Sequence, residues 1–151
     1  MKLATALSER ADLQRRISEL SVRLNNNAKV QEGEAPSEKP EELLKELDAC
    51  LLRLEELIAK INRTNNETKH GEETISDLIA RRDCLKERIR IMRDFLNASS
   101  DKVNRYSKAE IKILSTVSVA KLQKQLDGYS RQLRETDELI QGLNWTTDLI
   151  E

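Results

Sequence analysis

Apolar residues recur at alternating spacings of three and four along most of the chain, which is typical of helices that pack through one face. One such row contains Leu44, Leu47, Leu51, Leu54, Ile58 and Ile61. A helix with one apolar row among charged residues is stable only when neighbouring helices cover that row. We therefore predict a helix over residues 40–65, with Pro40 in its first turn, packed against other helices.

Three more rows of the same kind predict helices over residues 2–27, 75–98 and 119–143. Each of these rows has one polar member, namely Arg10, Arg82 or Thr136. Consecutive helices with compatible rows favour antiparallel packing. The sequence thus predicts an all-α fold, an antiparallel bundle of four long helices with heptad rows, in a single domain that spans residues 1–151.

The irregular linker over residues 99–118 is long for a helix connection, and its apolar residues alternate in a strand-like way around Ile111 and Ile113. In an antiparallel bundle this linker and the loop after the first helix emerge at the same end. We therefore predict that residues 29–34 pair with residues 111–117 as a short two-stranded ribbon. At the other end, Trp145 is expected to close the bundle as a hydrophobic plug.

Charged residues make up 35% of the 151 residues, against about 25% in an average protein, and aromatic residues only 3%. This balance suits a thin helical bundle with a large surface. The 26 basic and 27 acidic residues give a net charge of -1, so no global field favours nucleic acid or an anionic membrane. No apolar run is long enough for a transmembrane segment, and we expect a cytoplasmic protein whose two cysteines are reduced.

The linker also holds the first candidate binding site, formed by Arg105, Tyr106, Ser107 and Lys108. Cations around a tyrosine could bind phosphate or a nucleic-acid backbone. The alternative is structural: Tyr106 packs on the bundle end, and Ser107 caps a helical turn together with Glu110.

A second candidate site lies after the second predicted helix, where Asn62, Asn65 and Thr68 gather amide and hydroxyl groups. These groups could bind a small polar ligand together with the tail around Trp145. The alternative is that they cap the helix and form a turn.

Catalytic chemistry has little support in the sequence. Arg63 and His70 have a spacing similar to that of the Arg/His pair in helical ribonucleases of the HEPN type, but the residue after Arg63 is a threonine instead of the usual amide or acid. A di-iron bundle needs several histidines, and the chain has one. We predict no metal, no cofactor and no enzymatic activity.

Six stretches of the sequence resemble the septicolysin-like family of small bacterial helical proteins. They are ALSERADLQRRISEL (6–20), NNNAKVQEGEAPSEKPEELLKEL (25–47), INRTNNET (61–68), RRDCL (81–85), RYSKAEIK (105–112) and GLNWTTDL (142–149). The resemblance implies a helical fold and little chemistry, and the family name suggests a cytolysin.

The strict heptad rows favour contacts between chains, so the first hypothesis is a non-enzymatic homo-oligomer, a dimer first, that acts through protein–protein contacts. One alternative is a membrane-active cytolysin, as the family name suggests. Another is a HEPN-like ribonuclease or a nucleic-acid binder. The helices argue against the cytolysin, because their polar faces carry mixed charge instead of the Lys/Arg-rich face that lipid surfaces favour.

Overall fold

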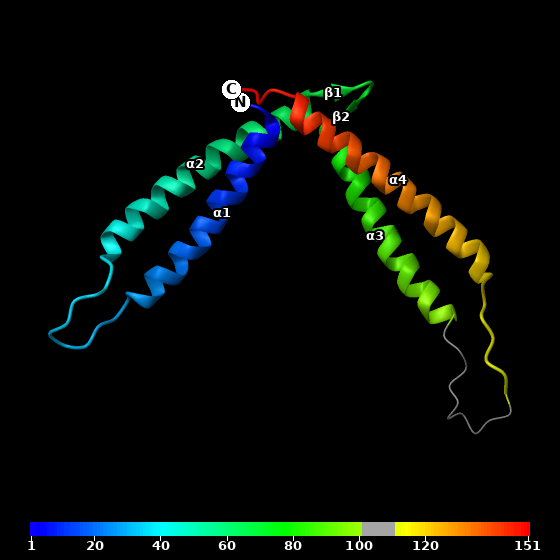
Figure 1. The fold of residues 1–151 in the computed structure, drawn as a ribbon, viewed down its shortest axis with the longest axis horizontal. Helices are drawn as coiled ribbons and strands as arrows, with labels where there is room; N and C mark the ends of the chain where they lie inside the picture. Colours follow the sequence, from blue (N-terminus) through cyan, green and yellow to red (C-terminus); the bar gives the residue numbers. More distant parts are fainter. Residues whose placement is uncertain (101–110) are drawn as a thin grey trace. The chain divides into compact units, whose positions relative to one another are not determined.

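The structure is a computed structural model that describes residues 1–100 and 111–151. It contains four long helices, α1 (Leu3–Asn26), α2 (Pro40–Glu67), α3 (Ile75–Ser100) and α4 (Val119–Thr146), and two short strands, β1 (Lys69–His70) and β2 (Glu73–Thr74) (Figure 1). The predicted all-α fold with four long helices is confirmed. The fourth helix runs past its predicted end at residue 143, so that Trp145 lies in its last turn.

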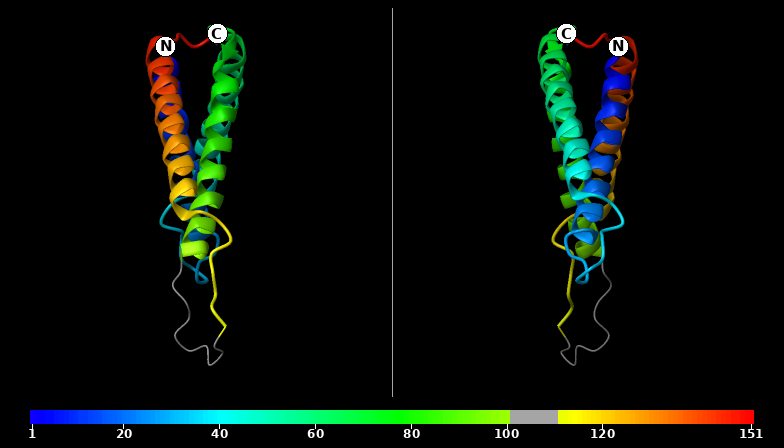
Figure 2. Two further views of the ribbon diagram at one scale, coloured as in Figure 1. Left: turned by 90° about the vertical axis from the view of Figure 1, so that its right-hand side faces the viewer. Right: turned by 90° about the vertical axis from the view of Figure 1, so that its left-hand side faces the viewer.

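The chain divides into two compact units. Unit 1 comprises Met1–Thr74 and Leu143–Glu151, and unit 2 comprises Ile75–Gly142. Unit 1 therefore holds α1, α2 and the strands, while unit 2 holds α3 and most of α4. The two helices of each unit lie side by side (Figures 1 and 2). That the whole chain forms one domain stays a prediction.

Unit 1 is held together by an apolar core between α1 and α2. Leu20, Leu43 and Cys50 are buried in it, and Leu13, Ile17, Leu24 and Leu47 pack against them. Farther along α2, Leu57 and Ile61 are also buried. The row predicted within residues 2–27 is confirmed for four of its members, since Leu13, Ile17, Leu20 and Leu24 all lie in this core.

The predicted row of α2 was wrong for three of its members, because Leu44, Leu51 and Ile58 are exposed. The buried row contains Leu43, Leu47, Cys50, Leu54, Leu57, Ile61 and Thr64, of which Leu47 and Leu54 are half-buried. Both rows contain Leu47, Leu54 and Ile61. At the other positions the buried residue is the one that directly precedes the predicted residue, for example Leu43 in place of Leu44. Since both satisfy the heptad spacing, the partner helix decides which one is covered.

Unit 2 has the core that its heptad rows predict. Ile89 and Leu96 of α3 and Leu126 of α4 are buried together. Met92, Val119, Leu122, Tyr129 and Leu133 pack around them. The polar members of these rows stay paired at the surface of the core: Arg82 lies 3.9 Å from Asp137, and Thr136 bonds its own helix.

The predicted ribbon between residues 29–34 and 111–117 was wrong, because neither segment forms a strand. An antiparallel ribbon forms instead between β1 and β2, with Lys69 opposite Thr74 and His70 opposite Glu73. Gly71 has φ +65°, a conformation that suits the first position of a two-residue hairpin loop. A loop of this length also closes at a lower entropic cost than the pairing of segments far apart in the chain.

Candidate interaction surface

The two long edges between α1 and α2 differ sharply in chemistry. On one edge, Arg53 binds Glu9 through two hydrogen bonds of 2.7 and 3.1 Å, and Arg16 binds Glu46 at 3.0 Å. At the far end, Arg23 binds Glu38. Glu9, Arg16 and Arg23 recur every seven residues on α1, as Glu46 and Arg53 do on α2, and Glu38 lies just before α2. We call this side of unit 1 the charged edge.

The charged edge would continue with a pair of like charges. Glu9 pairs with Arg53, and the positions seven residues further toward this end of the two helices are Lys2 and Lys60, which carry like charges. The C-terminal segment supplies the missing acids: Asp148 binds Lys2 at 2.8 Å, and Glu151 binds Lys60 at 2.9 Å. The segment thereby replaces a repulsive pair by two attractive ones.

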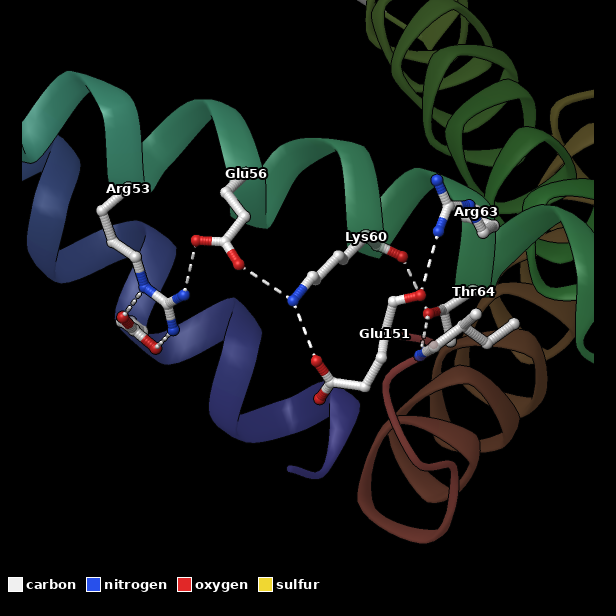
Figure 3. Close-up of polar contacts among 8 residues, drawn as sticks. Arg53, Glu56, Lys60, Arg63, Thr64 and Glu151 are labelled. Carbon is white, nitrogen blue, oxygen red and sulfur yellow. Dashed lines mark hydrogen bonds and ion pairs between the residues drawn. The ribbon is translucent and has the colours of Figure 1, made fainter.

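Figure 3 shows the resulting row of ion pairs, in which Glu56 joins Arg53 and Lys60 and the tail reaches α2. The hydrogen bond from Arg53 lowers the pKa of Glu9, and the hydrogen bond from Lys60 lowers the pKa of both Glu56 and Glu151. The hydrogen bonds that Arg53 and Lys60 donate to these carboxylates raise the pKa of both cations in turn. These shifts favour the charged form of each of the five groups.

The C-terminal segment is also bound through its backbone. The Leu3 N–H donates to the Thr147 carbonyl at 2.9 Å, and the Leu149 N–H donates to the Met1 carbonyl at 2.8 Å. Leu149 is buried. The segment therefore ties the start of α1 to the end of α4 within unit 1.

Thr64 of α2 binds the same C-terminal segment and is fully buried. Its hydroxyl donates to the Lys60 carbonyl at 2.8 Å and accepts the Ile150 N–H at 2.9 Å. Arg63 donates to the main-chain oxygen of Glu151 at 3.1 Å (Figure 3). The last turns of α2 therefore bind the C-terminal segment.

The predicted polar site at the end of α2 is a helix terminus. The Thr68 N–H donates to the Thr64 carbonyl at 2.9 Å, and Thr68 is the C-terminal cap of α2. Asn62 is exposed and Asn65 half-buried. The backbone placement fits the capping alternative, and the binding of a polar ligand by these residues stays a prediction.

Trp145 is not a plug, and this prediction was wrong. Its side chain is 67% exposed, because α4 continues through Thr146 and turns the indole away from the core. Leu149 takes the buried position instead. Arg105, Tyr106, Ser107 and Lys108 lie outside the described residues.

The catalytic alternative that involves Arg63 and His70 stays untested, and the structure shows only the contacts of the two residues. Arg63 binds the tail, and His70 is exposed in β1. Within residues 1–100 and 111–151, no group of three or more His, Cys, Asp or Glu residues could hold a metal ion. The ion-pair row and the tail therefore explain structure, and the open surface of unit 1 lies elsewhere.

On the opposite side of unit 1, α2 presents leucine and isoleucine where the charged edge has ion pairs, and we call this side the apolar edge. It comprises Leu44, Leu51 and Ile58 of α2, with Leu7, Gln14 and Ser21 at the matching seven-residue positions of α1. Leu44, Leu51 and Ile58 are 48%, 44% and 38% exposed. A helix pair that was complete would carry charges on both edges, as coiled coils do. The apolar edge is the strongest candidate for contact with another molecule.

Comparison with known proteins assigns the chain to a family. The model of a family of unknown function (DUF6847) matches residues 10–149. The chain belongs to this family. A solved structure, described as the crystal structure of a functionally unknown conserved protein from Corynebacterium diphtheriae, is similar to the chain with a TM-score of 0.92 and 39% sequence identity over 99% of each chain. No curated protein matches the chain.

Membership of the DUF6847 family corrects the resemblance to septicolysin-like proteins, which was wrong: neither the matching family nor the solved relative carries that description. Heptad rows and helix caps recur in unrelated helical proteins, so stretches dominated by them discriminate poorly between families. The cytolysin alternative rested on that name alone and is dropped. No helix in the described part of the chain is both long and apolar enough to cross a bilayer.

Reasoning from sequence missed the two edges, although a signal was present. Glu9, Arg16 and Arg23 recur every seven residues on the first helix, as Glu46, Arg53 and Lys60 do on the second. Writing the two helices antiparallel with these positions facing would have predicted the ion pairs. It would also have left Leu44, Leu51 and Ile58 on the opposite side.

Proposed function

We propose that this DUF6847 protein is a non-enzymatic helical protein that acts through protein–protein contacts, and that it associates with a second copy of itself through the apolar edge of unit 1. The observation that carries the proposal is the exposure of Leu44, Leu51 and Ile58 in one seven-residue register. A row in register is what a partner helix packs against, whereas scattered surface leucines need no partner.

Two-helix packing also gives a physical reason for association. Each helix of unit 1 covers the other on one side only, and the core cluster between them has Leu20, Leu43 and Cys50 as its buried members. Covering the apolar edge with further helices would add to this small core at about 25 cal/mol for each Å² of apolar surface removed from water. A second copy supplies such helices in a closed, symmetric assembly.

The test is the mass in solution, measured by light scattering behind size exclusion, for the wild type and two variants. We expect the wild type at a multiple of 17.4 kDa and Leu51→Asp at 17.4 kDa, because aspartate would have to be desolvated in the interface. Leu51 is exposed in unit 1, so the variant should keep its helical circular dichroism.

Ala49→Asp is the matched control. Ala49 is exposed and lies two residues before Leu51, so it points about 160° around the helix from Leu51. We expect this variant to keep the wild-type mass. A wild type that is monomeric at all concentrations, or equal effects of the two substitutions, would refute the proposed function.

A further inference from the structure

Unit 2 carries a groove whose charge is opposite to that of the α2 surface next to the apolar edge. The groove has a volume of about 450 Å³ and runs between α3 and α4. Its lining includes Ile89, which is buried, and Leu133, which is half-buried, and we call these two residues its apolar floor. The lining also includes the cations Lys86, Arg93 and Arg134.

The positive charge of this groove is only partly compensated by ion pairs of the described residues. Arg90, which also lines the groove, is bound to Glu87 and lies 3.6 Å from Asp94, so this arginine and the single acid of the lining offset each other. Among the described residues, no ion pair involves Lys86, Arg93 or Arg134. Three cations thus remain for an external group.

The flank of α2 beside the apolar edge has the opposite charge. Asp48 and Glu55 lie four residues after Leu44 and Leu51, respectively, so they occupy the strip of the helix surface next to these leucines. Both acids are exposed, and within the described ranges neither forms an ion pair. The α2 flank therefore presents leucines beside uncompensated acids.

The spacing on the two surfaces is the same. Asp48 and Glu55 are seven residues apart on α2, and Lys86 and Arg93 are seven residues apart on α3, so each pair spans about 10.5 Å along its helix. Two helices that pack side by side can therefore bring both acids opposite both cations while the leucines of one meet the apolar floor of the other.

From this match we infer that the groove of unit 2 receives the α2 flank of a second copy, with Asp48 and Glu55 pairing with Lys86 and Arg93 across the interface. In the dimer that we propose the exchange is reciprocal, since each copy offers one flank and one groove. The inference rests on the proposed function and names the surface that meets the apolar edge.

Charge reversal tests the pairing directly. The acid variant, Lys86→Glu with Arg93→Glu, and the base variant, Asp48→Lys with Glu55→Lys, each place like charges at both contacts of a homodimer. We expect each to run alone at 17.4 kDa. In an equimolar mixture, both contacts of a heterodimer again join opposite charges, and we expect the mass to return to twice that value.

The matched control is Lys121→Glu with Lys124→Glu on α4, which changes the net charge by the same amount as the acid variant and removes no ion pair of the described residues. It should keep the wild-type mass. All variants should retain wild-type helicity, because the altered side chains are exposed.

The outcomes separate the two proposals. If Leu51→Asp is monomeric while both charge-reversed variants remain associated, the inferred pairing is refuted and the proposed function stands. A monomeric wild type refutes both. If the wild type carries nucleic acid, seen in the 260/280 nm absorbance ratio, and only the acid variant loses it, the groove binds a polyanion instead of a second copy.

Discussion

Removing the hydroxyl of Thr64 should weaken the attachment of the C-terminal segment. Thr64→Val keeps the shape of the fully buried side chain but removes the acceptor of the Ile150 N–H, at 2.9 Å. The Lys60 carbonyl loses the hydroxyl bond of 2.8 Å, yet it keeps its helical partner in α2. The substitution therefore leaves one donor without a partner.

The expected loss of stability follows from the one N–H group, that of Ile150, that loses its acceptor. A buried N–H that loses its acceptor costs about 1–3 kcal/mol, and the half-buried position of Ile150 allows partial access to water. We therefore expect Thr64→Val to lower the free energy of unfolding by about 1–2 kcal/mol. Amide exchange at Ile150 should also become faster, because the bond that protects this group is lost.

Thr136→Val in α4 is the matched control. Thr136 is 7% exposed, and its hydroxyl donates to the Gln132 carbonyl at 2.8 Å without accepting a bond from another segment. Its loss leaves no donor unpaired, so the change should stay within about 0.5 kcal/mol. Urea unfolding followed by circular dichroism, at one protein concentration, compares the two. Equal losses for both variants would show that the bond to Ile150 does not hold the tail.

Two further predictions concern the α1–α2 pair. Leu57→Ala should lower the free energy of unfolding by about 2–5 kcal/mol and Leu52→Ala by less than about 0.5 kcal/mol, because Leu57 is fully buried and Leu52 is 68% exposed; a urea series that ranked them the other way would contradict the buried row. The stability of the wild type should fall as the pH falls from about 5 to 3, since the hydrogen bond from Arg53 lowers the pKa of Glu9 below its unfolded value and the unfolded chain then binds more protons. Glu9→Gln should flatten this dependence, and an unchanged slope would exclude a contribution from the pair.

The helices were predictable because their information is local. A heptad row, Pro40 in a first turn and the polar residues after Asn25 can be identified without knowledge of the partner. The burial of Leu43 in place of Leu44 could not be identified in this way. Adjacent rows on α2 are equally regular, and only the register against α1 selects between them.

The errors at the chain ends have a different origin. The ribbon and the plug were both placed by assuming one antiparallel bundle whose ends collect distant segments. In the structure, neighbouring segments form these contacts instead. Gly71 closes a short hairpin, and Leu149 is buried next to the start of α1, whereas Trp145 lies in the last turn of α4. A glycine after His70 was the available signal for the hairpin.

The wrong α2 row is itself informative about function. Leu44, Leu51 and Ile58 satisfy the heptad spacing as well as the buried residues do, yet α1 does not cover them. On the opposite side, the same helix pair is closed by ion pairs and, where two lysines would meet, by the acids Asp148 and Glu151. The charges of one edge are thus paired within the chain, while the apolar residues of the other edge stay exposed. Such an exposed row can pack against a further helix. That asymmetry is the physical basis for seeking the partner of unit 1 at the apolar edge.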